Sequence, residues 1–201
     1  MKIRPCSLGS GMDFVQAGAL VRNFTDAQVF PEHTTSVALN VAGPIKQWRM
    51  EFLFGYAIFP PNIMRFDAEW TNAGRKMAVG DVIIQRTMMP PVGFGVCIEF
   101  AVRVCALFDD EKRLGFAYET LSGHPESGVS EFYFEEREGD VFFTIHTRSQ
   151  PSHWTARFAS CVFTLPYQAW CTRRAAAQVR TRFHQENAAS IAAQAQKKPE
   201  A

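Results

Sequence analysis

Long apolar runs are absent from this 201-residue sequence. The two strongest, residues 52–61 and 159–171, fall short of the roughly 20 residues that a membrane-spanning helix needs, and both contain proline. The first residues also lack the apolar stretch of a secretory signal peptide. We therefore expect a soluble, cytoplasmic protein without membrane insertion.

An excess of one charge sign is absent too. The 21 basic and 20 acidic residues give a net charge of +1, which argues against binding to nucleic acid or to an acidic membrane surface. The sequence has no P-loop, no G-x-G-x-x-G, no G-x-S-x-G and no H-E-x-x-H. These absences remove support from the common motif-bearing enzyme classes, and we expect no cofactor.

Cysteine is sparse and irregularly placed. No two cysteines form a C-x-x-C pair, so the spacing predicts neither a disulfide framework nor a metal site, and favours buried thiols. The five cysteines are Cys6, Cys97, Cys105, Cys161 and Cys171.

What is present is the composition of one globular domain, with 47% hydrophobic and 20% charged residues. Residues 1–33 show no sustained periodicity, which predicts an irregular lead-in. Residues 34–186 contain the periodic segments and are predicted to form a single domain. Residues 187–201 are small and polar, which predicts a flexible tail.

The first part of this domain is predicted to form a strand followed by a helix. Residues 34–41 are rich in β-branched side chains, and Gly43-Pro44 ends that strand. Apolar residues then recur at helical spacing, which predicts a helix over residues 44–59. They are Ile45, Trp48, Phe52, Tyr56 and Phe59. A short strand is expected at residues 65–70.

Strands dominate the middle of the chain. Residues 82–87 and 96–108 are two of them, and the even positions of the second are all apolar. Because Glu99 and Arg103 occupy odd positions, we predict that only one face of this strand is buried.

Three further strands, at residues 115–120, 129–135 and 141–148, are predicted to form a meander. Pairing Glu119 with Glu131 and Phe134 with Phe143 gives one apolar face and one polar face. The predicted core face carries Phe116, Tyr118, Thr120, Phe132, Phe134, Val141, Phe143 and Ile145. The reverse face carries Glu119, Glu131, Tyr133, Glu135, Thr144, His146 and Arg148.

Helical periodicity returns from about Ser152 and continues to about Glu186, with a kink or break expected near Thr164–Pro166. An apolar sheet face needs a cover, and this helix provides one. We predict an α+β fold in which a curved antiparallel sheet wraps around a long C-terminal helix. A hot-dog-like fold is the alternative, but it leaves the C-terminal helix unexplained.

The segment GFAYETLSGHPESGVSEFYFE, residues 115–135, resembles the signature of the DUF1990 (UPF0548) family of uncharacterised proteins. The flanking segments GDVIIQR, SQPSHWTARF and FTLPYQAWCTRRA are similar to the same family, so the resemblance covers roughly residues 45–180. It implies no established activity and no catalytic residues. It does imply a helix-grip fold like that of the START and Bet v 1 lipid carriers.

His124 and Glu119 are the catalytic candidates. His124 lies in the loop of residues 122–128, where an imidazole could move protons near neutral pH, although turn formation explains the loop better. Glu119, with Glu131 and His146, could bind a divalent metal or form an acid–base pair on the reverse face. A solvated charged face is the better interpretation of these three residues.

The ligand-binding candidates are aromatic and aliphatic residues of the sheet and the C-terminal helix. They are Tyr118, Phe132, Phe134, Phe143, Ile145, Trp154 and Trp170. Simple core packing explains such residues about equally well. A basic run at Arg173, Arg174, Arg180 and Arg182 could contact phosphate, but it is best explained by the helix dipole.

Three functions follow from these candidates. The first is a binding protein for a small apolar or aromatic ligand, held in a cavity between the sheet and the C-terminal helix. The second is an enzyme that uses the same cavity with His124 or Glu119, and the third is a protein-interaction module. The sequence does not fix the oligomeric state.

Overall fold

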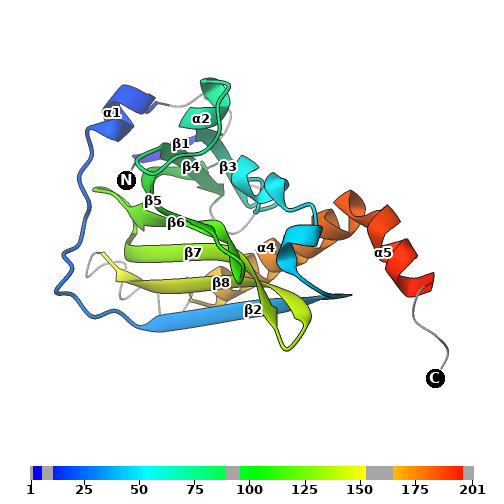
Figure 1. Cartoon of the computed structure of the whole chain (residues 1–201). Coiled ribbons are helices and arrows are strands. Elements are labelled where there is room, and N and C mark those ends of the chain that lie inside the picture. The colour runs from blue at the N-terminus through cyan, green and yellow to red at the C-terminus, as the bar shows by residue number, and fades with distance from the viewer. Residues whose placement is uncertain (1, 6–10, 89–95, 153–164, 197–201) are drawn as a thin grey trace.

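A computed structural model describes residues 2–5, 11–88, 96–152 and 165–196. One antiparallel sheet dominates it, with the strand order β2-β8-β7-β6-β5-β4-β3 and with β1 paired to β5 (Figure 1). The strands are β1 (Lys2–Pro5), β2 (Glu32–Ala42), β3 (Met64–Ala68), β4 (Val82–Met88), β5 (Val96–Asp109), β6 (Arg113–Thr120), β7 (Glu126–Arg137) and β8 (Asp140–Pro151).

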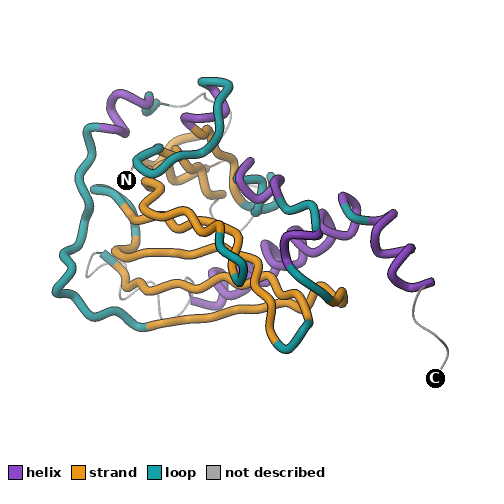
Figure 2. The backbone as a smooth tube through the Cα atoms, in the orientation of Figure 1, coloured by secondary structure: helices purple, strands orange, loops and turns teal. Residues whose placement is uncertain are grey.

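A long C-terminal helix lies against one face of this sheet. The helices are α1 (Phe14–Gly18), α2 (Glu69–Asn72), α4 (Leu165–Glu186) and α5 (Ala188–Gln196), with two 3-10 helices, η1 (Ile45–Gln47) and η2 (Glu51–Gly55). Figure 2 shows α4 running behind the strands, and it contacts β2 and β8. The predicted fold class, a curved antiparallel sheet around a C-terminal helix, is therefore confirmed.

The core lies between this sheet face and α4. All eight residues predicted for the core face are buried, and none of them is more than 8% exposed. The ring of Phe134 lies 5.3 Å from that of Phe143 and 6.0 Å from that of Phe183 on α4. Burial of apolar and aromatic area is the main driving force for such a fold.

The predicted register is confirmed for one strand pair and wrong for the other. Phe134 lies opposite Phe143, as predicted. Glu119 lies opposite Val129 rather than Glu131, because β7 begins at Glu126 and the turn before it is shorter than expected. The error is two residues, so the side chains stay on their predicted faces.

The predicted helix over residues 44–59 is wrong. The chain is extended at Trp48, and Tyr56 has a left-handed φ of 58°, so only η1 and η2 form. Leu53, Tyr56 and Ile58 are buried along with Trp48. Apolar side chains thus point inward from several sides of this segment, and contacts with the sheet override the helical periodicity. The predicted strand at residues 65–70 ends at Ala68, where α2 begins.

The prediction that β5 buries only one face is also wrong. Cys97, Glu99 and Ala101 on its odd face are all buried. A second, smaller core cluster covers this side, in which Ala17 of α1 packs with Ala101. Residues 1–33 thus contain β1 and α1, two elements that the sequence did not predict.

The C-terminal part agrees with the sequence at the end of the long helix and differs from it after that point. Helix α4 contains Pro166 and ends at Glu186, as expected, while Ser152 is a bend and residues 153–164 of the predicted helix lie outside the described residues. Residues 188–196 form α5, and Ile191 packs against the main core. No helix in the described segments is both long and apolar enough to cross a bilayer.

Among the cysteines that the structure describes, one differs from expectation. Cys97 forms a disulfide, whereas five free thiols were predicted. Cys105 is a free thiol. Burial raises the pKa of the Cys105 thiol to about 11, so this side chain is an un-ionised thiol at neutral pH.

Candidate functional site

The predicted ligand-binding residues of the sheet lie together on the concave face. Their side chains contact one another and neighbouring rings: Phe132 lies 5.4 Å from Tyr118 and 6.3 Å from Phe59. Phe132, Phe134 and Phe143 are at most 1% exposed. The space around them is therefore filled by protein, and a ligand role for these residues stays a prediction.

Of the two tryptophan candidates, the structure describes only Trp170. Trp154 lies outside the described residues. Trp170 is half-buried at the start of α4, and the guanidinium of Arg174 lies over its ring, 5.4 Å from the centroid. This contact is a cation–π interaction along one helix face.

A small polar cluster interrupts the aromatic core beside Tyr118. Gln85 donates a hydrogen bond to the hydroxyl of Tyr56, and all three side chains are buried. Burial raises the pKa of Tyr56 well above its usual value, with the neighbouring Tyr118 adding to the effect, and burial also raises the pKa of Tyr118. Both tyrosines are therefore neutral hydroxyls at physiological pH. The sequence pattern did not indicate that Gln85 and Tyr56 would meet at this position.

His124 forms the turn between β6 and β7. Its Nδ1 accepts a hydrogen bond from the backbone N–H of Glu126 at 2.9 Å, and its ring packs edge-on against Phe100 at 4.4 Å. Burial lowers the pKa of His124 to about 3. The imidazole is neutral at physiological pH and its Nδ1 is engaged by the backbone, which is the turn-forming role that the sequence favoured.

Glu126, two residues further on, was not singled out from the sequence. Its carboxylate accepts a hydrogen bond from Ser149 Oγ at 2.9 Å, and burial raises the pKa of this carboxyl. Asn23 donates to the Glu126 carbonyl at 2.8 Å, and Ser152 Oγ donates to the His124 carbonyl at 2.9 Å. The SGHPESG loop is thus fixed to the lead-in segment and to the end of β8.

Glu119 lies on the opposite face of the sheet from the aromatic core. Arg22 Nε donates to its carboxylate at 2.8 Å, so this glutamate holds the lead-in segment against the sheet. Glu131 pairs with Arg148 at 3.2 Å, and His146 Nδ1 contacts Thr34 Oγ1 at 2.8 Å. Each predicted metal or acid–base candidate therefore has a partner of its own. The described residues hold no cluster of three His, Cys, Asp or Glu side chains suited to a metal ion.

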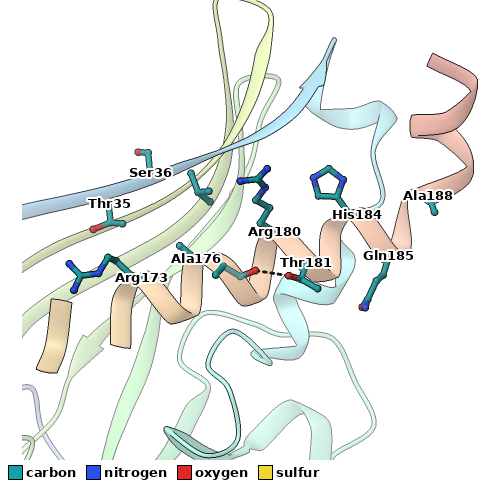
Figure 3. A pocket seen from close by; sticks show the side chains of 11 residues that line it. Thr35, Ser36, Arg173, Ala176, Arg180, Thr181, His184, Gln185 and Ala188 are labelled. Atoms are coloured by element: carbon teal, nitrogen blue, oxygen red, sulfur yellow. Dashed lines mark hydrogen bonds between the residues drawn. The ribbon is translucent and has the colours of Figure 1, made fainter. Parts of the chain in front are cut away.

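An open groove of about 850 Å³ lies elsewhere, between the edge strand β2 and helix α4 (Figure 3). Its floor is built from short and apolar side chains, among them Val37, Ala176 and Ala177. The lining residues are Thr35, Ser36, Val37, Arg173, Ala176, Ala177, Arg180, Thr181, His184, Gln185 and Ala188.

Helical spacing explains why α4 leaves this hollow. Residues three or four apart lie on one helix face, and Arg173, Ala177, Arg180 and His184 follow that spacing. In Figure 3 the side chains of Arg180 and His184 rise from α4 toward β2. The alanine between the two arginines is too short to fill the space, so a hollow remains between helix and strand.

The groove carries positive charge without a compensating carboxylate. None of its eleven lining residues is acidic, whereas Arg173, Arg180 and His184 are basic. His184 Nε2 is buried and has no hydrogen-bond partner in the described part of the chain. Arg174 and Arg182, by contrast, point to the rings of Trp170 and Phe52. For this basic run, contact with phosphate was considered from the sequence but the helix dipole was favoured, so the groove was missed.

Similarity to solved structures places the fold in a known class. The di-domain ARO/CYC protein StfQ from the steffimycin biosynthetic pathway aligns with a TM-score of 0.50 at 11% identity, over 80% of this chain and 52% of that one. Ginseng major latex-like protein 151 from Panax ginseng aligns with a TM-score of 0.43 at 15% identity, over 75% of this chain and 98% of that one. The curved sheet gripping a C-terminal helix is a helix-grip fold.

A family model described as a domain of unknown function, DUF1990, matches residues 33–178 of the 201-residue chain. The chain belongs to this family, as the sequence resemblance indicated. The comparison with curated proteins finds no relative.

Proposed function

We propose that this protein binds a small, largely apolar molecule in the groove between β2 and α4. The groove itself carries the proposal: its volume of about 850 Å³ lies in the range of small-molecule sites, and short apolar side chains form its floor. A ligand there would lie between the sheet and the C-terminal helix, as expected from the sequence, but against residues other than the predicted ligand-binding candidates.

The arrangement of the other candidates favours binding over catalysis. His124 and Glu119 lie at different places on the sheet, each engaged by its own partner, and neither lines the groove. A general acid or base must come within hydrogen-bond reach of the reacting group. The groove therefore supports a binding protein better than an enzyme that uses these two residues.

The test is titration with the neutral fluorophore N-phenyl-1-naphthylamine, together with variants that change the groove volume. Ala177→Leu adds three carbons inside the groove on an exposed helix position, so it should weaken probe binding without unfolding the chain. Ala169→Leu makes the same change at an exposed position of α4 that does not line the groove, and it should bind like the wild type.

Saturable probe binding that only Ala177→Leu weakens would support the proposal. Absence of binding to the folded wild type, or equal binding by all three proteins, would overturn it. That result would support the alternative function, a protein-interaction module. Native mass spectrometry of the purified protein is an independent measurement, since a tightly bound ligand would appear as an added mass that Ala177→Leu lacks.

A further inference from the structure

The two arginines of the groove differ from six arginines of the sheet and its loops. Each of those six has a carboxylate oxygen within 4 Å, and they are Arg22, Arg75, Arg86, Arg103, Arg137 and Arg148. Within the described residues, Arg173 and Arg180 form no such pair. Positive charge in a concave site attracts anions, since low-dielectric walls weaken the screening by water.

The positions along α4 place Arg180 close to His184 and Arg173 further away. Arg180 and His184 lie about one helical turn apart, so their heads can approach one ligand group from the same side. Arg173 precedes Arg180 by seven residues, which is about 10 Å along the helix axis. Ala176 and Ala177 fill this interval with a small apolar surface.

His184 supplies a second, independent observation. Its Nε2 atom is buried and lacks a hydrogen-bond partner in the described structure, although the ring lines the groove. Burying a polar atom without a partner is costly, so a rotation of the ring that brings Nε2 to the groove surface, where a ligand oxygen can pair with it, would be stabilising. An oxygen of an anionic group can accept a hydrogen bond from an imidazole N–H and from a guanidinium together.

We infer that the groove selects small amphipathic anions, with a carboxylate or sulfonate held between Arg180 and His184 and an apolar body lying over Ala176, Ala177 and Val37. This inference rests on the proposed function, because it names the ligand class for the same groove. The net charge of +1 and the confined apolar floor favour a small molecule over a nucleic acid or another polyanion.

Two fluorophores that differ by a single group test this selectivity. Anilinonaphthalene sulfonate has the ring system of N-phenyl-1-naphthylamine with one sulfonate added. The wild type should bind the sulfonate probe about tenfold more tightly than the neutral one, since charge-assisted hydrogen bonds are stronger than neutral contacts. Arg180→Gln should remove most of this difference, because it should weaken binding of the sulfonate probe far more than binding of the neutral probe.

Arg174→Gln is the matched control, because it removes the same charge from the same helix, where the side chain lies over Trp170. It should leave the affinity for both probes unchanged. Equal affinity of the wild type for the two probes would overturn the anion inference and leave the proposed function standing. Equal losses in Arg174→Gln and Arg180→Gln would also overturn it, since they would reflect net charge alone. Failure of both probes to bind would overturn the proposed function itself.

Discussion

Phe116 on β6 lies directly opposite Phe132 on β7, and their rings stack with centroids 5.5 Å apart and an angle of 22° between their planes. The same Phe132 ring contacts Tyr118 and Phe59, so it joins the sheet to the segment that covers it. Offset or tilted aromatic pairs add to the stability that area burial provides. This stack makes the concave face of the sheet a packed core, which leaves the groove beside α4 as the open space.

Truncation of this aromatic core should be strongly destabilising. Phe132→Ala and Phe143→Ala should each lower the free energy of unfolding by about 3–5 kcal/mol, because both rings are at most 1% exposed and each variant leaves a cavity. Urea denaturation followed by tryptophan fluorescence measures this loss.

Glu131→Ala provides the control on the neighbouring face. Glu131 pairs at 3.2 Å with Arg148, whose side chain is 46% exposed, so its loss should cost less than about 1 kcal/mol. Equal unfolding midpoints for Phe132→Ala and Glu131→Ala would contradict the assignment of the two faces.

The division of the meander into faces was predictable because strand periodicity is local. Alternation along β7 places Phe132 and Phe134 on one face whatever residue lies opposite them, so a register error of two residues left the core prediction intact. The start of β7 depends instead on the turn, where Gly123 adopts a positive φ of 87° and His124 accepts a backbone hydrogen bond. These turn contacts are not visible in a hydrophobic pattern.

The groove could not be predicted, because it joins strand and helix residues far apart in sequence. Thr35 and Val37 meet Arg180 only after β2 has become the sheet edge and α4 has packed across it. The one local signal is the spacing of Arg173, Ala177, Arg180 and His184 on a single helix face. Without knowledge of the neighbouring strand, that spacing is equally consistent with a helix face that lines a groove and with a helix face that is exposed to solvent.

Two strands approach each other unusually closely at Gly115, the first residue of the family signature. A Cβ atom there would lie 2.1 Å from the Phe132 carbonyl oxygen and 2.6 Å from Tyr133 Cα. Gly115→Ala should therefore separate β6 from β7 and lower the free energy of unfolding by about 1–3 kcal/mol. Thermal denaturation compares it with Gly18→Ala.

Gly18→Ala is the control because a Cβ atom at this end of α1 would meet nothing within 4 Å. Alanine is the better helix former, so this variant should be neutral or slightly stabilising. A melting temperature for Gly115→Ala that matches the wild type would show that the strands tolerate the extra carbon.

The buried imidazole of His124 should make stability depend on pH in the acid range. Its folded-state pKa of about 3 lies below the ordinary value of 6.5, so the unfolded chain binds a proton that the native state excludes between these two values. Stability therefore falls as the pH is lowered from 6.5 toward 3. The raised pKa of Glu126 acts in the opposite sense, since the native state then binds its proton more readily than the unfolded chain.

His124→Asn isolates the histidine contribution. The asparagine oxygen can accept the hydrogen bond from Glu126 N–H but does not titrate, while Glu126 is present in both proteins. Urea midpoints at pH 7 and pH 4 should drop less in the variant than in the wild type. An equal drop in the two proteins would mean that His124 is protonated in the native state at pH 4.

Asn187, one residue beyond the predicted domain end, should prove part of the folded unit. Its Oδ1 accepts from the backbone N–H of Arg49 at 2.8 Å, and its Nδ2 donates to the Arg49 and Phe183 carbonyls at 2.9 and 3.0 Å. The side chain is 2% exposed, and Asn187→Ala removes three hydrogen bonds, two of them to part-buried backbone groups of Arg49. A loss of about 2–3 kcal/mol in the free energy of unfolding is expected.

Ser190→Ala is the matched change at an exposed position of α5, and it should alter stability by less than about 0.5 kcal/mol. Chain shortening gives a second measurement. A chain that ends at Glu186 loses both Asn187 and Ile191, which packs against the core, so it should melt below a chain that ends at Gln196. Equal melting temperatures for the two shortened chains would instead place the end of the folded unit at Glu186. In that case neither the hydrogen bonds of Asn187 nor the packing of Ile191 would contribute to native-state stability.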